Sequence, residues 1–217
     1  MVSTTKCKWD IIIPFEPLWE QYNRIIKDDG VIALFGSEPF SSYLRLSNIK
    51  NYRYDFIWKK TMATLFQCAN KRPMVKHENI SIFYKKQPTY NPQFVEGNPY
   101  TRKEGSGNRK SSGFHTKDLI KKEINNSGTR YPTTILEFAN PNNKRLHPTQ
   151  KNINILEWLI KTYSNEGDLI LDNCMGSGST GIACINANRK FIGIEKDEKY
   201  FSIAKERIEG TDIEKFN

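Results

Sequence analysis

The chain has 217 residues, a hydrophobic share of 37% and a net charge of +9, which fit one α/β domain or one domain with an insertion. A positive charge of this size favours a polyanionic partner such as nucleic acid or an anionic membrane. No stretch approaches the roughly 20 apolar residues of a membrane helix, and the N-terminus lacks the apolar region of a secretory signal. The four cysteines and three histidines are scattered without metal-ligand or disulfide spacing, which suits a reducing cytoplasm and no metal site.

The first part of the chain alternates predicted helices and strands. Leu18, Tyr22 and Ile25 recur at helical spacing, and VIALFG is a short apolar run typical of a buried strand. The aromatic alternation of YRYDFIWKK favours another strand. We therefore expect, in chain order, a helix at 14–28, a strand at 31–36, a helix at 39–50 and strands at 52–60 and 77–86.

The chain changes character at about residue 87, and until residue 131 Gly, Ser, Asn, Pro and Lys cluster without periodicity. This composition predicts a loop-rich basic insertion. For the last third we expect strands at 133–139, 168–172 and 190–195 and helices at 152–164, 179–188 and 197–209. Apolar strands that alternate with helices predict an α/β fold with a parallel or mostly parallel sheet and helices on both faces.

The sequence LILDNCMGSGSTGIA, at 169–183, predicts a strand, a glycine loop and a helix. Its glycines satisfy GxGxxG, and Glu195 ends the next strand, where an acid can accept hydrogen bonds from ribose hydroxyls. The pattern suits a nicotinamide dinucleotide or S-adenosylmethionine. Asp172 favours the second, because a carboxylate attracts the cationic amino group of the methionine moiety and repels a pyrophosphate. A dinucleotide unit also normally opens its domain, whereas this loop lies near the end of the chain.

A second cluster, LHPTQK at 146–151, precedes the predicted helix at 152–164. Thr149 is the expected helix cap, with Gln150 and Lys151 in the first turn. Helix N-termini bind anions, so this segment is a candidate site for a carboxylate such as that of methionine. Taken alone, it also fits an ordinary Pro-Thr helix start.

Together these segments resemble a known family. LHPTQK, the helix after it, DNCMGSGSTGIA and FIGIEKDEKYFSIAKERI are similar to the cofactor half of the β-group DNA amino-methyltransferases. CKWDIIIPF, ALFGSEPF and KRPMVKHENISIFYKKQPTYNPQ are similar to the other half, as found in adenine-N6 enzymes of phages and prophages. The resemblance covers nearly the whole chain.

The resemblance implies a Rossmann-like, S-adenosylmethionine-dependent methyltransferase that acts on adenine N6 in double-stranded DNA. In this family the catalytic half comes first, then target recognition, then the cofactor half. That order places the glycine loop late in the chain. It divides this sequence into 1–86, 87–131 and 132–217.

The resemblance also implies roles for individual residues. The cofactor loop would be formed by Asp172, Met175, Gly176 and Gly178, and the ribose would be held by Glu195. The methionine carboxylate would be held by Thr149, Gln150 and Lys151, and the pocket would be lined by Phe35, Gly36 and Ser37. DNA phosphate contacts in the target-recognition segment would come from Arg102, Lys103, Arg109, Lys110, Lys117, Lys121 and Lys122.

One part of the family pattern has no counterpart. The catalytic Asp-Pro-Pro-Tyr motif, which binds the target amino group and stacks on the flipped base, would precede the CKWD segment. Met1 begins where this motif would just have ended, so we expect a shortened chain without the central catalytic strand. Three functions stay open: a DNA adenine-N6 methyltransferase, a non-catalytic DNA- or cofactor-binding protein of the same fold, and a Rossmann-type oxidoreductase.

Overall fold

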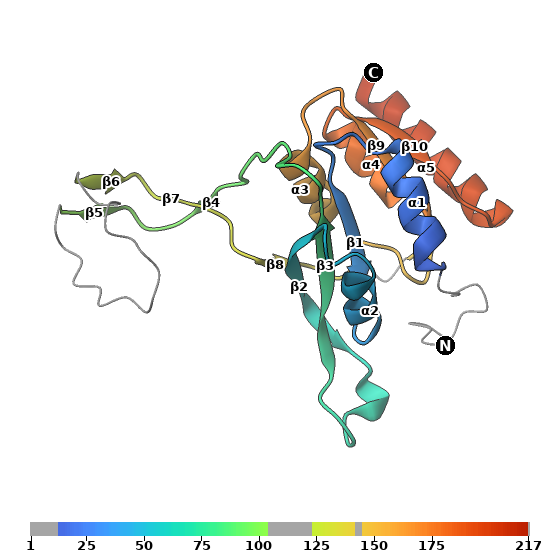
Figure 1. Ribbon diagram of the computed structural model, residues 1–217, viewed down its shortest axis with the longest axis horizontal. Coiled ribbons are helices and arrows are strands. Elements are labelled where there is room, and N and C mark those ends of the chain that lie inside the picture. Colours follow the sequence, from blue (N-terminus) through green and yellow to red (C-terminus); the bar gives the residue numbers. More distant parts are fainter. Residues whose placement is uncertain (1–12, 104–122, 142–144, 217) are drawn as a thin grey trace. The chain divides into compact units, whose positions relative to one another are not determined.

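The computed structural model describes residues 13–103, 123–141 and 145–216 and divides the chain into two compact units (Figure 1). Unit 1 comprises Met1–Asn91 and Thr133–Asn217, and unit 2 comprises Pro92–Pro132. No helix of the described ranges is long and apolar enough to cross a membrane.

A four-stranded sheet forms the centre of unit 1. Its order is β1 (Ile32–Gly36), β3 (Val75–Phe83), β2 (Tyr52–Thr64) and β8 (Ile135–Phe138). Strand β3 runs antiparallel to both β1 and β2, and only β2 and β8 are parallel. The prediction of a parallel or mostly parallel sheet is therefore wrong for this four-stranded sheet. Strands β2 and β3 follow each other as a hairpin, which needs no crossover helix and makes the pair antiparallel.

Helices cover both faces of this sheet, as the sequence predicts. On one face, α3 (Ile153–Tyr163) and α4 (Ser179–Asn186) pack on a core that includes Trp58, Ile80 and Ile82. On the other, Trp19 of α1 (Phe15–Ile25) and Leu44 of α2 (Phe40–Ser47) pack on Phe83. Ile82 and Phe83 are neighbours in β3 but belong to different cores, because successive strand residues point to opposite faces.

A second, two-stranded sheet carries the glycine loop. Strand β9 (Leu169–Asp172) pairs in parallel with β10 (Lys190–Gly193), and α4 connects them. Helix α5 (Glu198–Phe216) follows. The parallel arrangement is confirmed for this β-α-β unit. Ile170 and Phe191 face the core, while the opposite side leaves four large apolar residues exposed: Leu169, Leu171, Ile192 and Ile194.

Unit 2 contains two short antiparallel ladders that sequence patterning does not predict. Strand β4 (Val95–Glu96) pairs with β7 (Thr129–Arg130), and β5 (Tyr100–Arg102) pairs with β6 (Ile124–Asn126). Strands of two or three residues are too short for alternation to be recognised in the sequence.

The hairpin of β2 and β3 is longer than predicted. Strand β2 continues to Thr64 rather than residue 60, and a short helix, η1 (Phe66–Cys68), lies at the turn. Its pairing with β8 ends at Lys60, so the last part of the strand extends beyond the four-stranded sheet. Figure 1 shows this hairpin projecting from the body of unit 1.

Candidate functional site

The backbone of the loop between β9 and α4 depends on two glycines. Gly176 and Gly178 adopt left-handed conformations, with φ of +54° and +76°. A Cβ on Gly178 would lie 3.0 Å from the Cβ of Ala204 in α5. Glycine is therefore needed here both for the backbone conformation and for the close approach of α5.

The two predicted carboxylates shape this loop. Asp172 accepts hydrogen bonds from the Thr180 hydroxyl at 2.6 Å and the Cys174 amide at 3.1 Å. Glu195 accepts from the amides of Gly176 at 2.8 Å and Asp197 at 3.0 Å. Since each carboxylate oxygen can accept more than one hydrogen bond, both acids keep acceptor capacity for a ligand.

The LHPTQK segment packs directly on the glycine loop. The Ser177 hydroxyl donates to Gln150 Oε1 at 3.2 Å, and the His147 ring lies 3.3 Å from the position a Cβ on Gly176 would take. The His147 ring also meets the Tyr200 ring edge-on, at 4.3 Å between centroids. Burial lowers the pKa of the His147 imidazole. The structure thus brings together the two clusters that the sequence separates by some 20 residues.

Thr149 does not cap a helix, contrary to expectation. The cap of α3 is Asn152, whose side chain accepts from the Asn154 amide at 2.7 Å. Asparagine is the stronger capping residue, and the apolar face of the helix begins directly after it. Thr149 instead contacts His147 Nδ1, at 3.1 Å from its hydroxyl. Gln150 and Lys151 precede the helix, so the prediction that they lie in its first turn is wrong.

Lys151 belongs to a charged cluster that sequence reasoning missed. Its ammonium lies 2.8 Å from Glu78 Oε2, and Lys60 lies 2.5 Å from Glu78 Oε1. The ammonium of Lys151 also lies 5.2 Å from the Phe35 ring centroid, and that of Lys60 lies 4.8 Å from the Trp58 ring. The members come from β1, β2, β3 and the loop before α3, so no local motif reveals them.

Opposing effects act on the carboxyl group of Glu78. Burial raises the pKa of this carboxyl group. The ammonium groups of Lys151 and Lys60 together lower it by more than burial raises it, so the pKa lies below its usual value. The carboxylate is therefore ionised in the folded protein, and its charge balances part of the positive charge of the two lysines.

Two other predicted pocket residues lie in the glycine loop and at the end of β1. Met175 is buried, and its sulfur occupies the space beside Gly193, at 2.2 Å from the position of an added Cβ. Ser37 directly follows β1, and its carbonyl accepts a hydrogen bond from the Ser41 amide. The Ser179 hydroxyl, at the start of α4, is buried without a hydrogen-bond partner among the described residues.

Helix α1 is attached to the loop by a contact that no sequence pattern signals. The Tyr22 hydroxyl donates to Asn173 Oδ1 at 2.9 Å, although the residues are 151 positions apart. Burial, more than the nearby Cys174 and Asp172, raises the pKa of Tyr22 to about 12. The neutral phenol therefore remains a hydrogen-bond donor throughout the physiological range.

Two of the seven predicted phosphate contacts lie in described parts of unit 2. Arg102 ends β5, and Lys103 follows it. The other five lie outside the described residues: Arg109, Lys110, Lys117, Lys121 and Lys122. Within unit 2, the Arg130 guanidinium stacks over the Tyr100 ring at 4.7 Å and donates to the Asn126 side chain. Arg130 therefore stabilises the two ladders.

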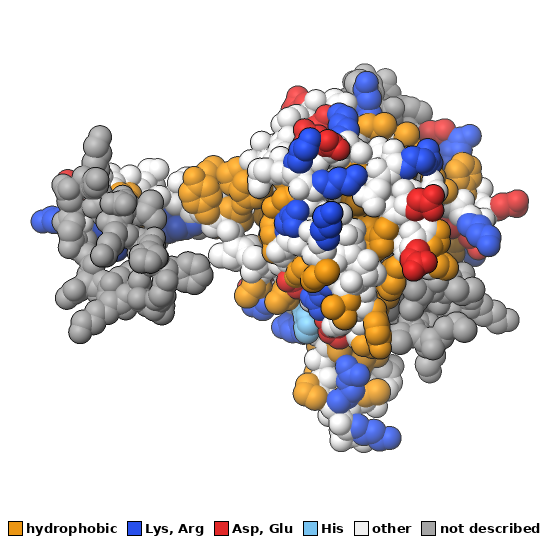
Figure 2. All heavy atoms as spheres, viewed as in Figure 1, with side chains coloured by type: hydrophobic (Ala, Val, Ile, Leu, Met, Phe, Trp, Pro, Cys, Tyr) orange, Lys and Arg blue, Asp and Glu red, His pale blue; other side chains and the backbone are white. Residues whose placement is uncertain are grey.

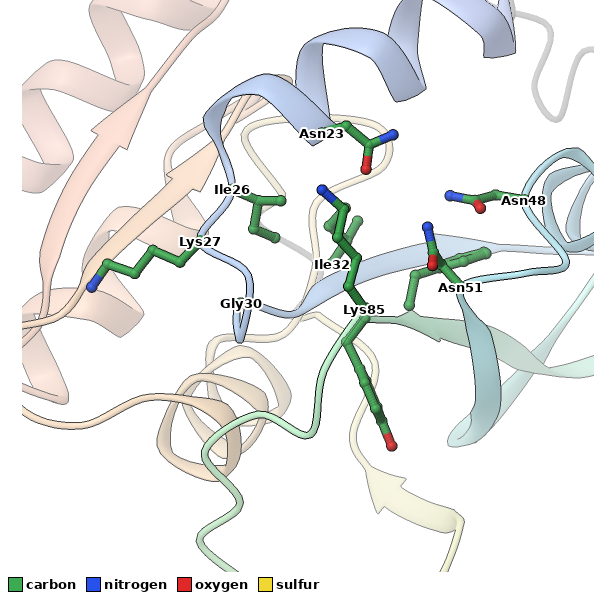
Figure 3. A pocket seen from close by; sticks show the side chains of 10 residues that line it. Asn23, Ile26, Lys27, Gly30, Ile32, Asn48, Asn51 and Lys85 are labelled. Atoms are coloured by element: carbon green, nitrogen blue, oxygen red, sulfur yellow. The ribbon is translucent and has the colours of Figure 1, made fainter.

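A separate hollow lies at the opposite end of β1 from Phe35 and Ser37. It is lined by the end of α1, the start of β1 and the end of β3, including Asn23, Ile32 and Lys85 (Figure 3). None of the residues that line this hollow is a candidate cofactor-binding residue. Among the described residues, no three His, Cys, Asp or Glu side chains group as metal ligands.

Comparisons with known sequences point to one family. A family model described as DNA methylase, of the N6/N4 type, matches residues 9–206. The chain is 37% identical over 205 residues to the type II methyltransferase M.HpaI of Haemophilus parainfluenzae, covering 91% of this chain and 59% of that protein. It is 29% identical to M2.DpnII of Streptococcus pneumoniae, covering 96% of this chain and 74% of that protein. The chain thus spans less than two thirds of the length of M.HpaI.

Solved structures show the same fold. The S-adenosylmethionine complex of M1.HpyAVI matches 86% of this chain and 79% of its own, with a TM-score of 0.58 and 26% identity. PvuII DNA methyltransferase, described as cytosine-N4-specific, matches 98% of this chain and 81% of its own, with a TM-score of 0.62 and 16% identity. The Rossmann-like methyltransferase architecture expected from the sequence is confirmed.

Proposed function

The chain belongs to the N6/N4 DNA methylase family, and we propose on this basis that it binds S-adenosylmethionine and serves methyl transfer to adenine N6 in double-stranded DNA. The comparisons support a DNA methyltransferase and S-adenosylmethionine as its cofactor. The choice of adenine over cytosine rests on the resemblance of the first half of the chain to adenine-N6 enzymes.

The convergence of two clusters on one loop carries this proposal. Gln150 and His147 contact the loop residues Ser177 and Gly176, and Glu195 accepts a hydrogen bond from the Gly176 amide. In the proposed complex, Asp172 faces the cationic amino group of the methionine moiety and Glu195 binds the ribose hydroxyls. Thr149, Gln150 and Lys151 hold the methionine carboxylate.

Lys151 fits this role in spite of its ion pair. Glu78 lies between two ammonium groups, so the cluster of Glu78, Lys60 and Lys151 keeps one net positive charge. A ligand carboxylate beside Lys151 would be attracted by this remaining charge. The bound cofactor supplies an electrophilic methyl group, and the residues of this chain bind and orient it.

A second candidate function is binding of cofactor and DNA without transfer. The 217 residues contain no Asp-Pro-Pro-Tyr sequence, the family motif that would bind the target amino group. The activity of this chain alone is therefore expected to be impaired, whereas the residues proposed to bind the cofactor are all present.

Cofactor binding is tested by calorimetry with S-adenosylmethionine. We expect Glu195→Gln to weaken binding about tenfold or more, because a charged acceptor of two hydroxyl groups is lost. Glu166→Gln, at an exposed position, serves as the control and should leave binding unchanged. Tighter binding of NADH than of S-adenosylmethionine would contradict the proposal and favour an oxidoreductase.

Transfer is tested with methyl-labelled S-adenosylmethionine and unmethylated duplex DNA, followed by digestion to nucleosides. Label in N6-methyladenine supports the first candidate. Label in N4-methylcytosine would overturn the choice of base. Binding of both ligands without any labelled product would favour the second candidate.

A further inference from the structure

The projecting end of the β2–β3 hairpin, residues 61–77, combines exposed apolar and basic side chains. Phe66 is 71% exposed and Met62 is 68% exposed, and Leu65 and Met74 are also open to solvent. None of the four belongs to either described core cluster. Lys71, Arg72 and Lys76 are exposed beside them. Figure 2 shows basic and apolar side chains together at the end of this projection.

The distribution of charge singles out this hairpin. Residues 59–77 contain five Lys or Arg and no Asp or Glu, and residues 92–132 contain eight Lys or Arg and four Asp or Glu. The rest of the chain holds 20 of each kind and is neutral. The net charge of +9 therefore arises within residues 59–77, where Lys59 and Lys60 at the base pair with Glu137 and Glu78, and within unit 2.

The tip of the hairpin is an ordered structure. Leu65 adopts a left-handed conformation, with φ of 64°, and η1 is closed by backbone hydrogen bonds from Cys68 to Leu65 and from Ala69 to Phe66. The Asn140 side chain accepts from the Met62 amide at 2.9 Å. The turn therefore holds Phe66 in an exposed position. Its apolar side chain is not buried in the protein, so packing in a core does not explain why an apolar residue lies here.

The hairpin extends from the end of the sheet that carries the candidate site. Gly36, the last residue of β1, pairs with Asn79, and the residues of β3 before Asn79 continue past it. Lys60 at the base of the hairpin shares Glu78 with Lys151. A duplex whose target base enters beside Phe35 and Lys151 would therefore meet the hairpin.

We propose that the tip of this hairpin is a DNA-binding surface, separate from the predicted target-recognition segment, in which Phe66 acts as an apolar wedge and Lys71, Arg72 and Lys76 contact phosphates. Apolar side chains that insert at base steps and flanking cations that neutralise phosphates are a recurrent means of binding duplex DNA. The inference rests on the proposed function for its partner, double-stranded DNA.

The test measures binding of a fluorescent DNA duplex by anisotropy over a range of salt concentrations. Phe66→Ala should weaken binding about tenfold. Lys71→Ala with Arg72→Ala should weaken it and reduce the slope of log affinity against log salt by about 2. The controls are Tyr43→Ala, for an exposed aromatic residue on α2, and Lys50→Ala with Lys85→Ala, for exposed lysines elsewhere. The controls should leave affinity and slope unchanged.

The outcomes separate this inference from the proposed function. The inference fails if the hairpin variants bind DNA as tightly as the unmodified chain. It also fails if the unmodified chain binds no DNA. Calorimetry with S-adenosylmethionine tests cofactor binding independently of both results. Loss of DNA binding in the hairpin variants would support it even if no methyl transfer occurs. If Phe66→Ala instead abolishes self-association in sedimentation and leaves DNA affinity intact, the tip is a contact between copies and the inference fails.

Discussion

Glu78 shows how a single residue can connect the sheet to the candidate site. Its carboxylate pairs with Lys60 in β2 and Lys151 before α3, and its side chain is only 17% exposed. Removing a partly buried charge leaves the two lysines next to each other without their shared counter-ion. Such a loss costs more than the loss of an exposed pair.

Glu78→Gln should therefore destabilise the protein by about 2 kcal/mol at pH 7. Because the folded pKa of Glu78 is lowered, its stabilising contribution is complete above the unfolded pKa and is lost as the pH falls through the folded value. The difference between the unmodified protein and the variant should shrink below about pH 4. Urea unfolding at pH 7 and at pH 3.5 measures this difference.

Glu137→Gln provides the comparison. Glu137 pairs with Lys59 at 2.7 Å, but both side chains are largely exposed, so little change is expected at either pH. A Glu78 variant whose stability loss is the same at both pH values would show that the carboxylate charge is not the cause.

At the scale of elements, the glycine loop depends on its contact with α5. Gly178 and Gly167 both have positive φ, but they differ in their surroundings. A Cβ on Gly178 would meet Ala204 and Ile208 at 3.0–3.1 Å, whereas one on Gly167 would meet nothing within 4 Å. Substitution of Gly167 therefore introduces backbone strain alone, whereas substitution of Gly178 adds a steric clash that displaces the loop.

We expect Gly167→Ala to cost about 1 kcal/mol of stability through backbone strain alone and to leave cofactor affinity unchanged. Gly178→Ala should cost more and should weaken S-adenosylmethionine binding at least tenfold, because the loop must move away from α5. Thermal unfolding and calorimetry on both variants provide the measurements. Equal affinity in the two variants would show that the contact of Gly178 with α5 does not position the loop.

The elements predicted correctly are those with strong local patterns. The strand at 168–172, the glycine loop and the helix after it follow from an apolar run and three glycines, and β9 and α4 lie where this pattern places them. The length of the β2–β3 hairpin is different, because Thr61–Thr64 carries no alternation and its extension depends on pairing with Val75 across the hairpin. Sequence also misassigned the cap of α3, since Thr149 and Asn152 are both capable caps and only the observed turn selects Asn152.

Candidate site residues stand out in the sequence where one segment contains the whole motif. Glu195, Gly176 and Gln150 lie in recognisable sequences, and the structure joins them by hydrogen bonds within the loop region. Glu78, Tyr22 and Phe66 lie in no motif. Their proposed roles depend on contacts or exposure created by distant parts of the chain, and pairing across some 70 to 150 residues cannot be read from local spacing.

At the scale of the whole molecule, positive charge is divided between the hairpin and unit 2. Unit 2 carries a net charge of +4, and its described strands pair only with each other: β4 with β7 and β5 with β6. The described core clusters lie entirely in unit 1. Folding and cofactor binding are therefore expected to depend on unit 1. DNA affinity is expected to depend on the β2–β3 hairpin and on unit 2.

Replacing Pro92–Pro132 by a flexible Gly-Ser linker of about ten residues tests this division. We expect cooperative unfolding and S-adenosylmethionine affinity to be retained, because neither the core nor the proposed cofactor residues are removed. DNA affinity should fall and the salt slope should decrease, since up to seven proposed phosphate contacts are lost. Combining the replacement with Lys71→Ala and Arg72→Ala should reduce the slope further, by the same amount as these substitutions produce in the full chain. If the replacement abolishes cofactor binding in a protein that still unfolds cooperatively, unit 2 contributes to the cofactor site and the division of roles is wrong.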